Sequence, residues 1–168
     1  MARLEQFEGR FPYMYLCTAG KVTVGIGHAI PTAAAAALLS WATGGDVAQA
    51  GWAAVTGAEK GLVASSYASL TACRMSYDAI DQLAANDVAA FTASLRANFP
   101  QWDAYPAPAQ AALFDMAYNL GVAGLKKFTS MLAAVNAGDW ETAAQQCHRM
   151  GIGDARNQET AALFRQCE

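Results

Sequence analysis

Alternation of apolar and polar positions near the N-terminus predicts a β-hairpin. Aromatic and β-branched residues dominate residues 13–26, and residues 18–21 have the composition of a turn. After this turn Val22 and Val24 alternate with Thr23. Because successive side chains of a strand point to opposite faces, we expect the two valines to pack inward and Thr23 to lie on the opposite, exposed face.

In the second half of the chain apolar residues recur every three or four positions, which predicts helices. Ser76 is a good N-cap for a helix that runs to about Asn98. Pro106 and Pro108 open a strongly apolar helix, which we expect to form the core. Residues 32–75 are rich in Ala and interrupted by glycines, which predicts short helices joined by turns. The remaining predicted helices cover residues 3–9, about 125–136, about 139–149 with Asp139 as cap, and about 155–164.

The order of these elements predicts an α+β protein of one domain over residues 1–168. A small β-lobe occupies about residues 11–75, and a larger helical lobe occupies about residues 88–168 together with the helix at 3–9. The chain is 54% hydrophobic and 15% charged, as expected of a compact globular protein. Its net charge of −3 provides no broad basic field, so we expect no nucleic-acid partner.

The N-terminal residues have neither a long apolar run nor the pattern of a signal peptide. The longest apolar stretch, Ala33 to Leu39, is too short to cross a bilayer. We therefore expect a protein that is made in the cytoplasm without a signal peptide and does not insert into a membrane. We also expect it to be a monomer.

The cysteines are too few for a dense disulfide framework. They are Cys17, Cys73, Cys147 and Cys167. Reduced, mostly buried thiols are the favoured interpretation, with a disulfide between Cys147 and Cys167 as the alternative. Cys147 and His148 are adjacent and nothing complements them, so the sequence predicts neither a metal site nor a cofactor.

Three residues near the N-terminus could together perform glycoside hydrolysis. That reaction needs a carboxylic acid to protonate the leaving oxygen, and a group that positions water or stabilises the oxocarbenium-like transition state. Glu8 lies near the end of the short predicted helix and faces a hairpin that carries the Cys17 thiol and the Thr23 hydroxyl. Taken singly, each residue also has a plain structural explanation as a surface Glu, a core Cys and an exposed strand Thr.

Taken together, these residues resemble the catalytic signature of phage-type lysozymes, glycoside hydrolase family 24. In that signature eight residues separate the Glu from an Asp or Cys, and five more precede a Thr; Glu8, Cys17 and Thr23 meet both spacings. The neighbouring positions that match are Gly9, Tyr15, Gly20 and Val24 to His28. Further similar segments are residues 76–95, 110–121, 138–144 and 156–164. The resemblance covers most of the chain but not residues 32–75, and it implies a lysozyme-like fold.

The resemblance implies roles for the three residues. Glu8 is the general acid, Cys17 takes the place that Asp usually holds, and Thr23 lies next to the attacking water. A thiol is mostly neutral at neutral pH, so Cys17 stabilises charge less than a carboxylate would. Cys17 could orient water as a thiol, act as a thiolate, or attack the anomeric carbon.

The resemblance implies supporting residues as well. Arg156 matches an Arg that pairs with the catalytic Glu. Asn119 matches a polar residue that lines the sugar cleft, with Tyr118 nearby as cleft wall or core. His28 and Asp87 match a buried pair that links the hairpin to the long helix, which favours a structural ion pair over a catalytic or metal-binding His28.

The implied activity is that of a muramidase, which cleaves the β-1,4 bond between N-acetylmuramic acid and N-acetylglucosamine in peptidoglycan. A lytic transglycosylase uses no water-positioning residue, so Cys17 and Thr23 argue against it, and a binding module that has lost activity is the second alternative. The protein would act in the periplasm, as an endolysin released through a holin or as an effector domain of a secretion machinery with an immunity protein. The insertion at residues 31–75 could be a lid, an added sugar subsite, an immunity-protein contact or a helical elaboration of the β-lobe, the last being favoured.

Overall fold

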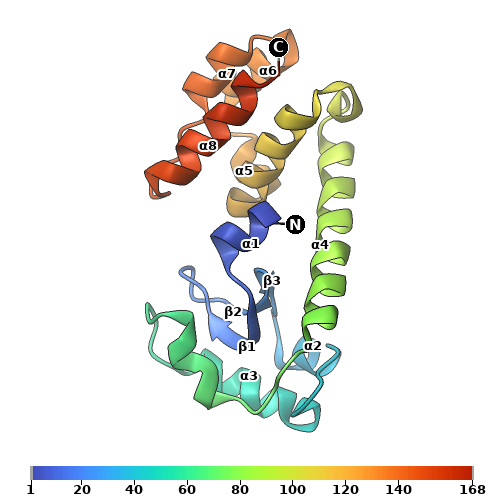
Figure 1. The fold of residues 1–168 in the computed structure, drawn as a ribbon, viewed down its shortest axis with the longest axis vertical. Coiled ribbons are helices and arrows are strands. Elements are labelled where there is room, and N and C mark those ends of the chain that lie inside the picture. The colour runs from blue at the N-terminus through green and yellow to red at the C-terminus, as the bar shows by residue number, and fades with distance from the viewer. Residues whose placement is uncertain (1, 168) are drawn as a thin grey trace. The chain divides into compact units, whose positions relative to one another are not determined.

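The computed structural model describes residues 2–167 and has the α+β architecture that the sequence predicts (Figure 1). A three-stranded antiparallel sheet lies near the N-terminus, and helices make up most of the rest. The chain divides into two compact units, Met1–Val88 and Ala89–Glu168, with the division inside the long helix α4 (Tyr77–Asn98). Within residues 2–167 we find no helix both long and apolar enough to cross a bilayer.

The first unit is built around the predicted hairpin. The short helix α1 (Ala2–Glu8) leads into β1 (Phe11–Leu16), which pairs with β2 (Val22–Gly25), and β2 pairs in turn with β3 (His28–Ala29). The predicted short helices follow as α2 (Ala33–Ala37), η1 (Gly45–Val47), α3 (Ala48–Thr56) and η2 (Ala64–Leu70).

The structure corrects the expectation that Thr23 is exposed, because only 3% of this residue is accessible. Thr23 lies in the central strand, between Tyr15 of β1 and Ala29 of β3. Helices also cover the sheet: α3 contacts β1 and β2, and Ile80 of α4 lies against Gly25. Alternation along a strand predicts which residues share a face, but a second layer can bury the other face as well.

The helix α1 belongs to the first unit, whereas the sequence pattern grouped it with the helical lobe. Arg10, two residues beyond α1, explains this placement. Its guanidinium pairs with Glu5 of α1 at 3.2 Å and with Asp81 of α4 at 2.6 Å, and it donates to the carbonyl of Tyr77 at 3.2 Å. Arg10 therefore holds the end of α1 against the first turns of α4.

The second unit is helical. Its elements after α4 are η3 (Trp102–Ala104), α5 (Ala107–Leu125), α6 (Thr129–Ala137), α7 (Trp140–Gln146) and α8 (Asp154–Arg165). The core lies around α5, as predicted, with Leu113 and Met116 fully buried. Gly121 interrupts the helical backbone of α5 with φ 73 and ψ 160. A helical segment continues beyond this kink to Leu125, and α6 begins at Thr129, later than the predicted start at about residue 125.

Two predicted helix caps are confirmed. The hydroxyl of Ser76 accepts a hydrogen bond from the amide of Ala79 at 3.1 Å, at the start of α4. Asp139 accepts one from the amide of Thr142 at 3.0 Å, at the start of α7. Each cap satisfies an amide that has no partner within its own helix.

All four cysteines are free thiols, so the alternative of a Cys147–Cys167 disulfide is not realised. Cys147 donates to the carbonyl of Ala144 at 3.1 Å, and Cys167 to that of Leu163 at 3.4 Å. Burial raises the pKa of both thiols, which keeps them neutral. Cys17 is the one thiol of the four that is partly exposed.

Candidate active site

Glu8 is placed by the sharp turn that ends α1. Gly9 follows it with φ +72, and its amide donates to the carbonyl of Glu5 at 2.9 Å. A Cβ atom on Gly9 would stand 2.5 Å from the ring of Phe11, so a larger residue has neither the backbone conformation nor the space. The turn leaves Glu8 half-buried at the last position of α1, directly before the Arg10 contacts.

Cys17 and Thr23 are joined through one carbonyl group at the tip of the hairpin. The carbonyl oxygen of Lys21 accepts hydrogen bonds from the amide of Cys17 and from the hydroxyl of Thr23, both at 3.0 Å. Gly20, at φ +70, closes the turn by donating to the carbonyl of Cys17 at 2.7 Å. The turn that the sequence predicts at residues 18–21 therefore fixes the two candidate residues relative to each other.

The hydrogen bond to Lys21 determines what the Thr23 hydroxyl can do next. A hydroxyl has one proton and two lone pairs, and the proton of Thr23 is already donated. The oxygen can still accept a hydrogen bond, for example from a water molecule. A water held as a donor in this way keeps a lone pair free for attack, which is the geometry that hydrolysis requires.

Glu8 and the Cys17–Thr23 pair flank β1, since Glu8 precedes this strand in the chain and Cys17 follows it. The register of β1 against β2 shifts between Phe11 and Tyr15. Such an irregularity bends a strand, and it is often found next to functional sites, where it redirects side chains. All three residues belong to the first unit.

The structure contains the pair that the resemblance implies between His28 and Asp87. Their Nδ1 and Oδ2 atoms are 2.8 Å apart, which joins β3 to α4. The pair is less buried than expected, with 24% and 27% of the two side chains exposed. The ring nitrogen engaged by Asp87 is held in place, as expected for a structural contact.

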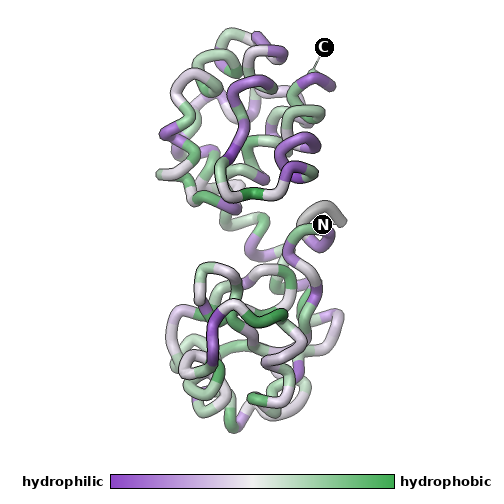
Figure 2. The backbone as a smooth tube through the Cα atoms, turned by 90° about the vertical axis from the view of Figure 1, so that its left-hand side faces the viewer, coloured by the Kyte–Doolittle hydropathy of each residue, from purple (hydrophilic) through white to green (hydrophobic). Residues whose placement is uncertain are grey.

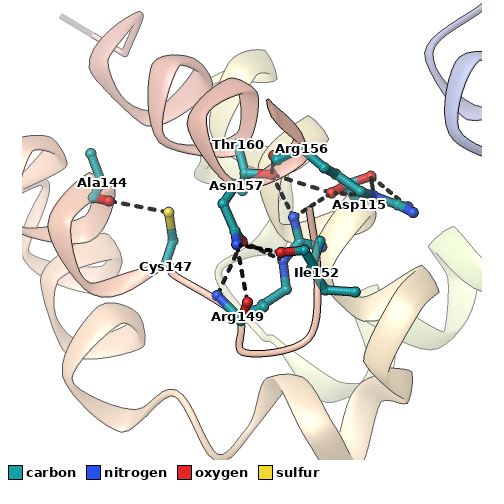
Figure 3. A network of polar contacts seen from close by, with 8 residues as sticks. All are labelled: Asp115, Ala144, Cys147, Arg149, Ile152, Arg156, Asn157 and Thr160. Carbon is teal, nitrogen blue, oxygen red and sulfur yellow. Dashed lines mark hydrogen bonds and ion pairs between the residues drawn. The ribbon is translucent and has the colours of Figure 1, made fainter. Parts of the chain in front are cut away.

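Arg156 lies in the second unit, where it takes part in a buried network that is drawn in Figure 3. Its Nη2 and Nε donate to Oδ1 of Asp115 at 2.9 and 3.1 Å, and Nη2 of Arg149 lies 2.9 Å from Oδ2. Thr160 receives a bond from Arg149 at 2.8 Å, and Asn157 accepts from the Arg149 amide at 3.0 Å.

The charges in this network alter the pKa of Asp115. Burial alone would raise it, but hydrogen bonds and charge from Arg156 and Arg149 outweigh burial and hold it below its usual value of 3.8. For Arg149 burial has the opposite effect and lowers the pKa, because the charged form of an arginine is the protonated one. The side chain of Arg156 is thus held by an ionised carboxylate. Its pairing with Glu8 stays a prediction from the resemblance.

The sequence analysis missed Asp115 and Arg149. The available signal was a single acidic residue, Asp115, between Leu113 and Ala117 on the apolar face of a core helix. A carboxylate at such a position is almost never buried without a partner, so a cation from elsewhere in the chain was to be expected.

The two predicted cleft residues lie together on α5 in the second unit. Asn119 is exposed, whereas the ring of Tyr118 is half-buried. That ring stacks on Phe114 at 5.8 Å and meets the edge of Phe91 at 5.6 Å. Tyr118 therefore belongs partly to the core, and the sugar-binding role of both residues remains a prediction. Among the described residues, no three or more His, Cys, Asp and Glu side chains are grouped as a metal site would require.

Two comparisons with known proteins indicate the family of the chain. Over 44 residues, 26% of this chain, the sequence is 50% identical to the pre-baseplate central spike protein Gp5 of Enterobacteria phage T4. The match spans only 8% of that much longer protein. The model of the phage lysozyme family matches residues 5–166, which is nearly the whole chain. With Glu8, Cys17 and Thr23 inside that match, the chain belongs to the phage lysozyme family, a family of peptidoglycan hydrolases.

Proposed function

We propose that the protein is a muramidase that hydrolyses the β-1,4 bond between N-acetylmuramic acid and N-acetylglucosamine. The observation that carries this proposal is the link between Cys17 and Thr23 through the Lys21 carbonyl, in a chain where Glu8 stands at the family spacing. Half-burial of Glu8 after a rigid turn suits a group that must present its proton in one direction.

In the proposed reaction Glu8 gives its proton to the glycosidic oxygen as the bond to the anomeric carbon breaks. Thr23 accepts a hydrogen bond from a water molecule, whose oxygen lone pair forms the new bond to that carbon. Cys17 is the second acceptor for this water. Because Cys17 is partly exposed, the proton that the water loses passes to solvent there.

Residues of the second unit complete the proposal. Arg156 matches the Arg that pairs with the catalytic Glu in the family, and its bonds to the Asp115 carboxylate fix the orientation of its guanidinium. Asn119 donates to or accepts from the acetamido or hydroxyl groups of the sugar, and Tyr118 forms the wall beside it. These assignments rest on the family resemblance of the matching positions.

Clearing of purified cell walls tests the proposal. Wild type should reduce turbidity, Glu8→Gln should not, and Glu59→Gln should behave as wild type because the same change is made on an exposed loop residue. Clearing by Glu8→Gln at the wild-type rate would contradict the assigned acid. If wild type sediments with walls without cleaving them, the protein is a binding module.

Mass spectrometry of the released fragments separates hydrolysis from its close rival. Hydrolysis adds water and leaves a reducing sugar, whereas a lytic transglycosylase leaves an anhydro sugar of lower mass. We expect reducing ends, because the Thr23 hydroxyl donates to Lys21 and so keeps its lone pairs available to accept from a water.

Three variants define the part of Cys17. Retained activity in Cys17→Asp with loss in Cys17→Ala would show that the thiol stands where a carboxylate usually does. Activity in Cys17→Ser shows that a neutral acceptor suffices to hold the water. Full activity in Cys17→Ala would remove Cys17 from the mechanism.

We propose that the site of action is the periplasm, reached with the help of a holin or a secretion machinery. Production of the chain in a bacterial cytoplasm, with and without a co-produced holin, tests this. Lysis only in the presence of the holin supports an endolysin. Growth arrest on export to the periplasm, relieved by a co-produced neighbouring gene product, would support an effector with an immunity protein.

A further inference from the structure

Two lysines lie at the tip of the hairpin, next to the residues proposed to hold the attacking water. Lys21 belongs to the turn itself, and its carbonyl is the group that joins Cys17 to Thr23. Lys60 comes from the loop between α3 and η2, yet its side chain lies across Gly20 of the turn. A Cβ atom on Gly20 would stand 3.4 Å from Cδ and Cε of Lys60 and 3.6 Å from its Nζ. The ammonium group of Lys60 therefore lies beside the turn that positions Cys17 and Thr23.

The loop that carries Lys60 is held in place by a buried tyrosine. Tyr67 of η2 is fully buried, and its hydroxyl donates to the carbonyl oxygen of Glu59, the residue before Lys60, at 2.7 Å. The helix η2 in turn packs on β1, the strand that leads into the turn. The fold thus fixes the backbone of Lys60 next to the hairpin, while the lysine itself is exposed.

The two lysines lack the partners that Arg10 and Arg74 have. Arg10 pairs with two carboxylates, and the guanidinium of Arg74 donates to three backbone carbonyls. Within the described part of the first unit, neither Lys21 nor Lys60 forms an ion pair with a carboxylate of the chain. Both ammonium groups are therefore available to an anion from outside the protein.

The hairpin contains no carboxylate that could neutralise these lysines. The sequence has no Asp or Glu from Gly9 to Gly45, and Cys17 stands where the family usually has Asp. Figure 2 shows how few polar positions the first unit has, since its tube is largely white and green with few purple segments. Two like charges held at one turn repel each other, and a bound anionic group offsets that repulsion.

We propose that Lys60 and Lys21 are specificity-determining residues that bind a carboxylate of the glycan strand beside the bond that is cleaved. Muramic acid carries a lactyl group, whose carboxyl is free in peptide-free strands and is joined to an acidic peptide in intact ones. The group recognised is this carboxylate and not the sugar. The insertion at residues 31–75 then selects the substrate, because it supplies Lys60. The inference rests on the proposed function, since it concerns the same site.

Removing the negative charge of the substrate tests this inference. Soluble glycan strands are compared before and after their carboxyl groups are coupled to methylamine, which caps the charge and leaves the glycosidic bonds intact. Lys60→Gln and Lys21→Gln should each raise KM on uncapped strands about 2- to 5-fold, the contribution of one exposed ion pair. The value of kcat should not change, because the contact is the same in the ground state and the transition state. On capped strands both variants should have the KM of wild type.

A matched substitution in the second unit controls for the change in net charge. Lys127→Gln alters an exposed lysine there and should behave as wild type on both substrates. About 0.5 M NaCl should reduce the effect of Lys60→Gln, because salt screens exposed charges. Equal KM values for Lys60→Gln and Lys127→Gln on uncapped strands would overturn the inference. A loss that persists on capped strands would also overturn it, since the loss would then come from packing on Gly20.

Two substrate preparations identify the source of the carboxylate. Strands freed of their peptides by an amidase keep only the lactyl carboxylate, whereas intact strands carry the carboxylates of the peptide. An effect of Lys60→Gln on peptide-free strands assigns the lactyl group, and an effect on intact strands alone assigns the peptide. Either result supports carboxylate recognition.

Binding measurements keep this inference separate from the proposed cleavage. In the Glu8→Gln chain, Lys60→Gln should raise the Kd for uncapped strands about 2- to 5-fold and leave that for capped strands unchanged. If wild type cleaves nothing but this difference in Kd occurs, the muramidase proposal fails and carboxylate recognition stands. If wild type cleaves and neither KM nor Kd depends on capping, carboxylate recognition alone is refuted.

Discussion

Replacing Asp115 with Ala would leave two arginines of the second unit without their shared counter-ion. Asp115 and Arg149 are 2% and 1% exposed, so neither charge can be solvated in place. Removing one partner of a buried ion pair costs about 3–5 kcal/mol. Nη1 of Arg149 has no hydrogen-bond partner among the described residues even in the intact protein, so it provides no reserve contact. Each kcal/mol lowers Tm by roughly 2–4 °C in a protein of this size, so we expect a Tm lower by about 6–20 °C.

Thermal unfolding followed by far-ultraviolet circular dichroism measures this effect. Asp103→Ala is the matched control, because Asp103 pairs with Arg96 on the surface, where such pairs contribute about 0–1 kcal/mol. The double variant Asp115→Leu, Arg149→Met should recover much of the loss, since it removes the carboxylate and the more deeply buried of its two arginines and leaves only Arg156, whose side chain is 11% exposed. A Tm for Asp115→Ala equal to that of the control would refute the reasoning, as would a double variant that is less stable than Asp115→Ala.

The same ion pair predicts how stability depends on pH. The pKa of Asp115 lies below its usual value of 3.8 in the folded protein, because Arg156 and Arg149 outweigh the effect of burial. A carboxylate with a lowered folded pKa stabilises the protein above its unfolded pKa and ceases to do so as the pH falls through the folded pKa. The Tm difference between wild type and Asp115→Ala should therefore be constant from about pH 5 upward and narrow below pH 3.8.

Four further substitutions have expected effects on thermal stability that the same measurement checks. Ser76→Ala removes the cap of α4 and should cost about 1 kcal/mol, whereas an unchanged Tm would mean that the cap bond does not stabilise the helix. Gly9→Ala forces φ +72 on an L-residue and brings a Cβ against Phe11, so we expect a loss of about 1–2 kcal/mol; a gain in stability would contradict the required turn. His28→Ala leaves Asp87 without its partner and should cost about 1–2 kcal/mol, and Asp87→Asn should cost less if the contact is a hydrogen bond more than an ion pair.

Local features of the fold could be predicted from the sequence because neighbouring residues determine them. Ser76 and the helical spacing after it predict α4, and the turn residues at 18–21 predict the hairpin. The spacing of Glu8, Cys17 and Thr23 indicated the candidate site for the same reason, since all three lie within one short stretch of chain.

Only the tertiary structure decided which of these residues are buried and which distant groups meet. Alternation predicts two faces for β2, but whether helices cover both faces depends on segments far along the chain, and so Thr23 is buried against expectation. Asp115 and Arg156 are 41 positions apart, and no local pattern predicts that a guanidinium of α8 pairs with a carboxylate of α5. Interactions between residues that are near in the sequence thus determine the helices, strands and turns. Burial and charge pairing depend on contacts between distant segments, which form only when the chain has folded.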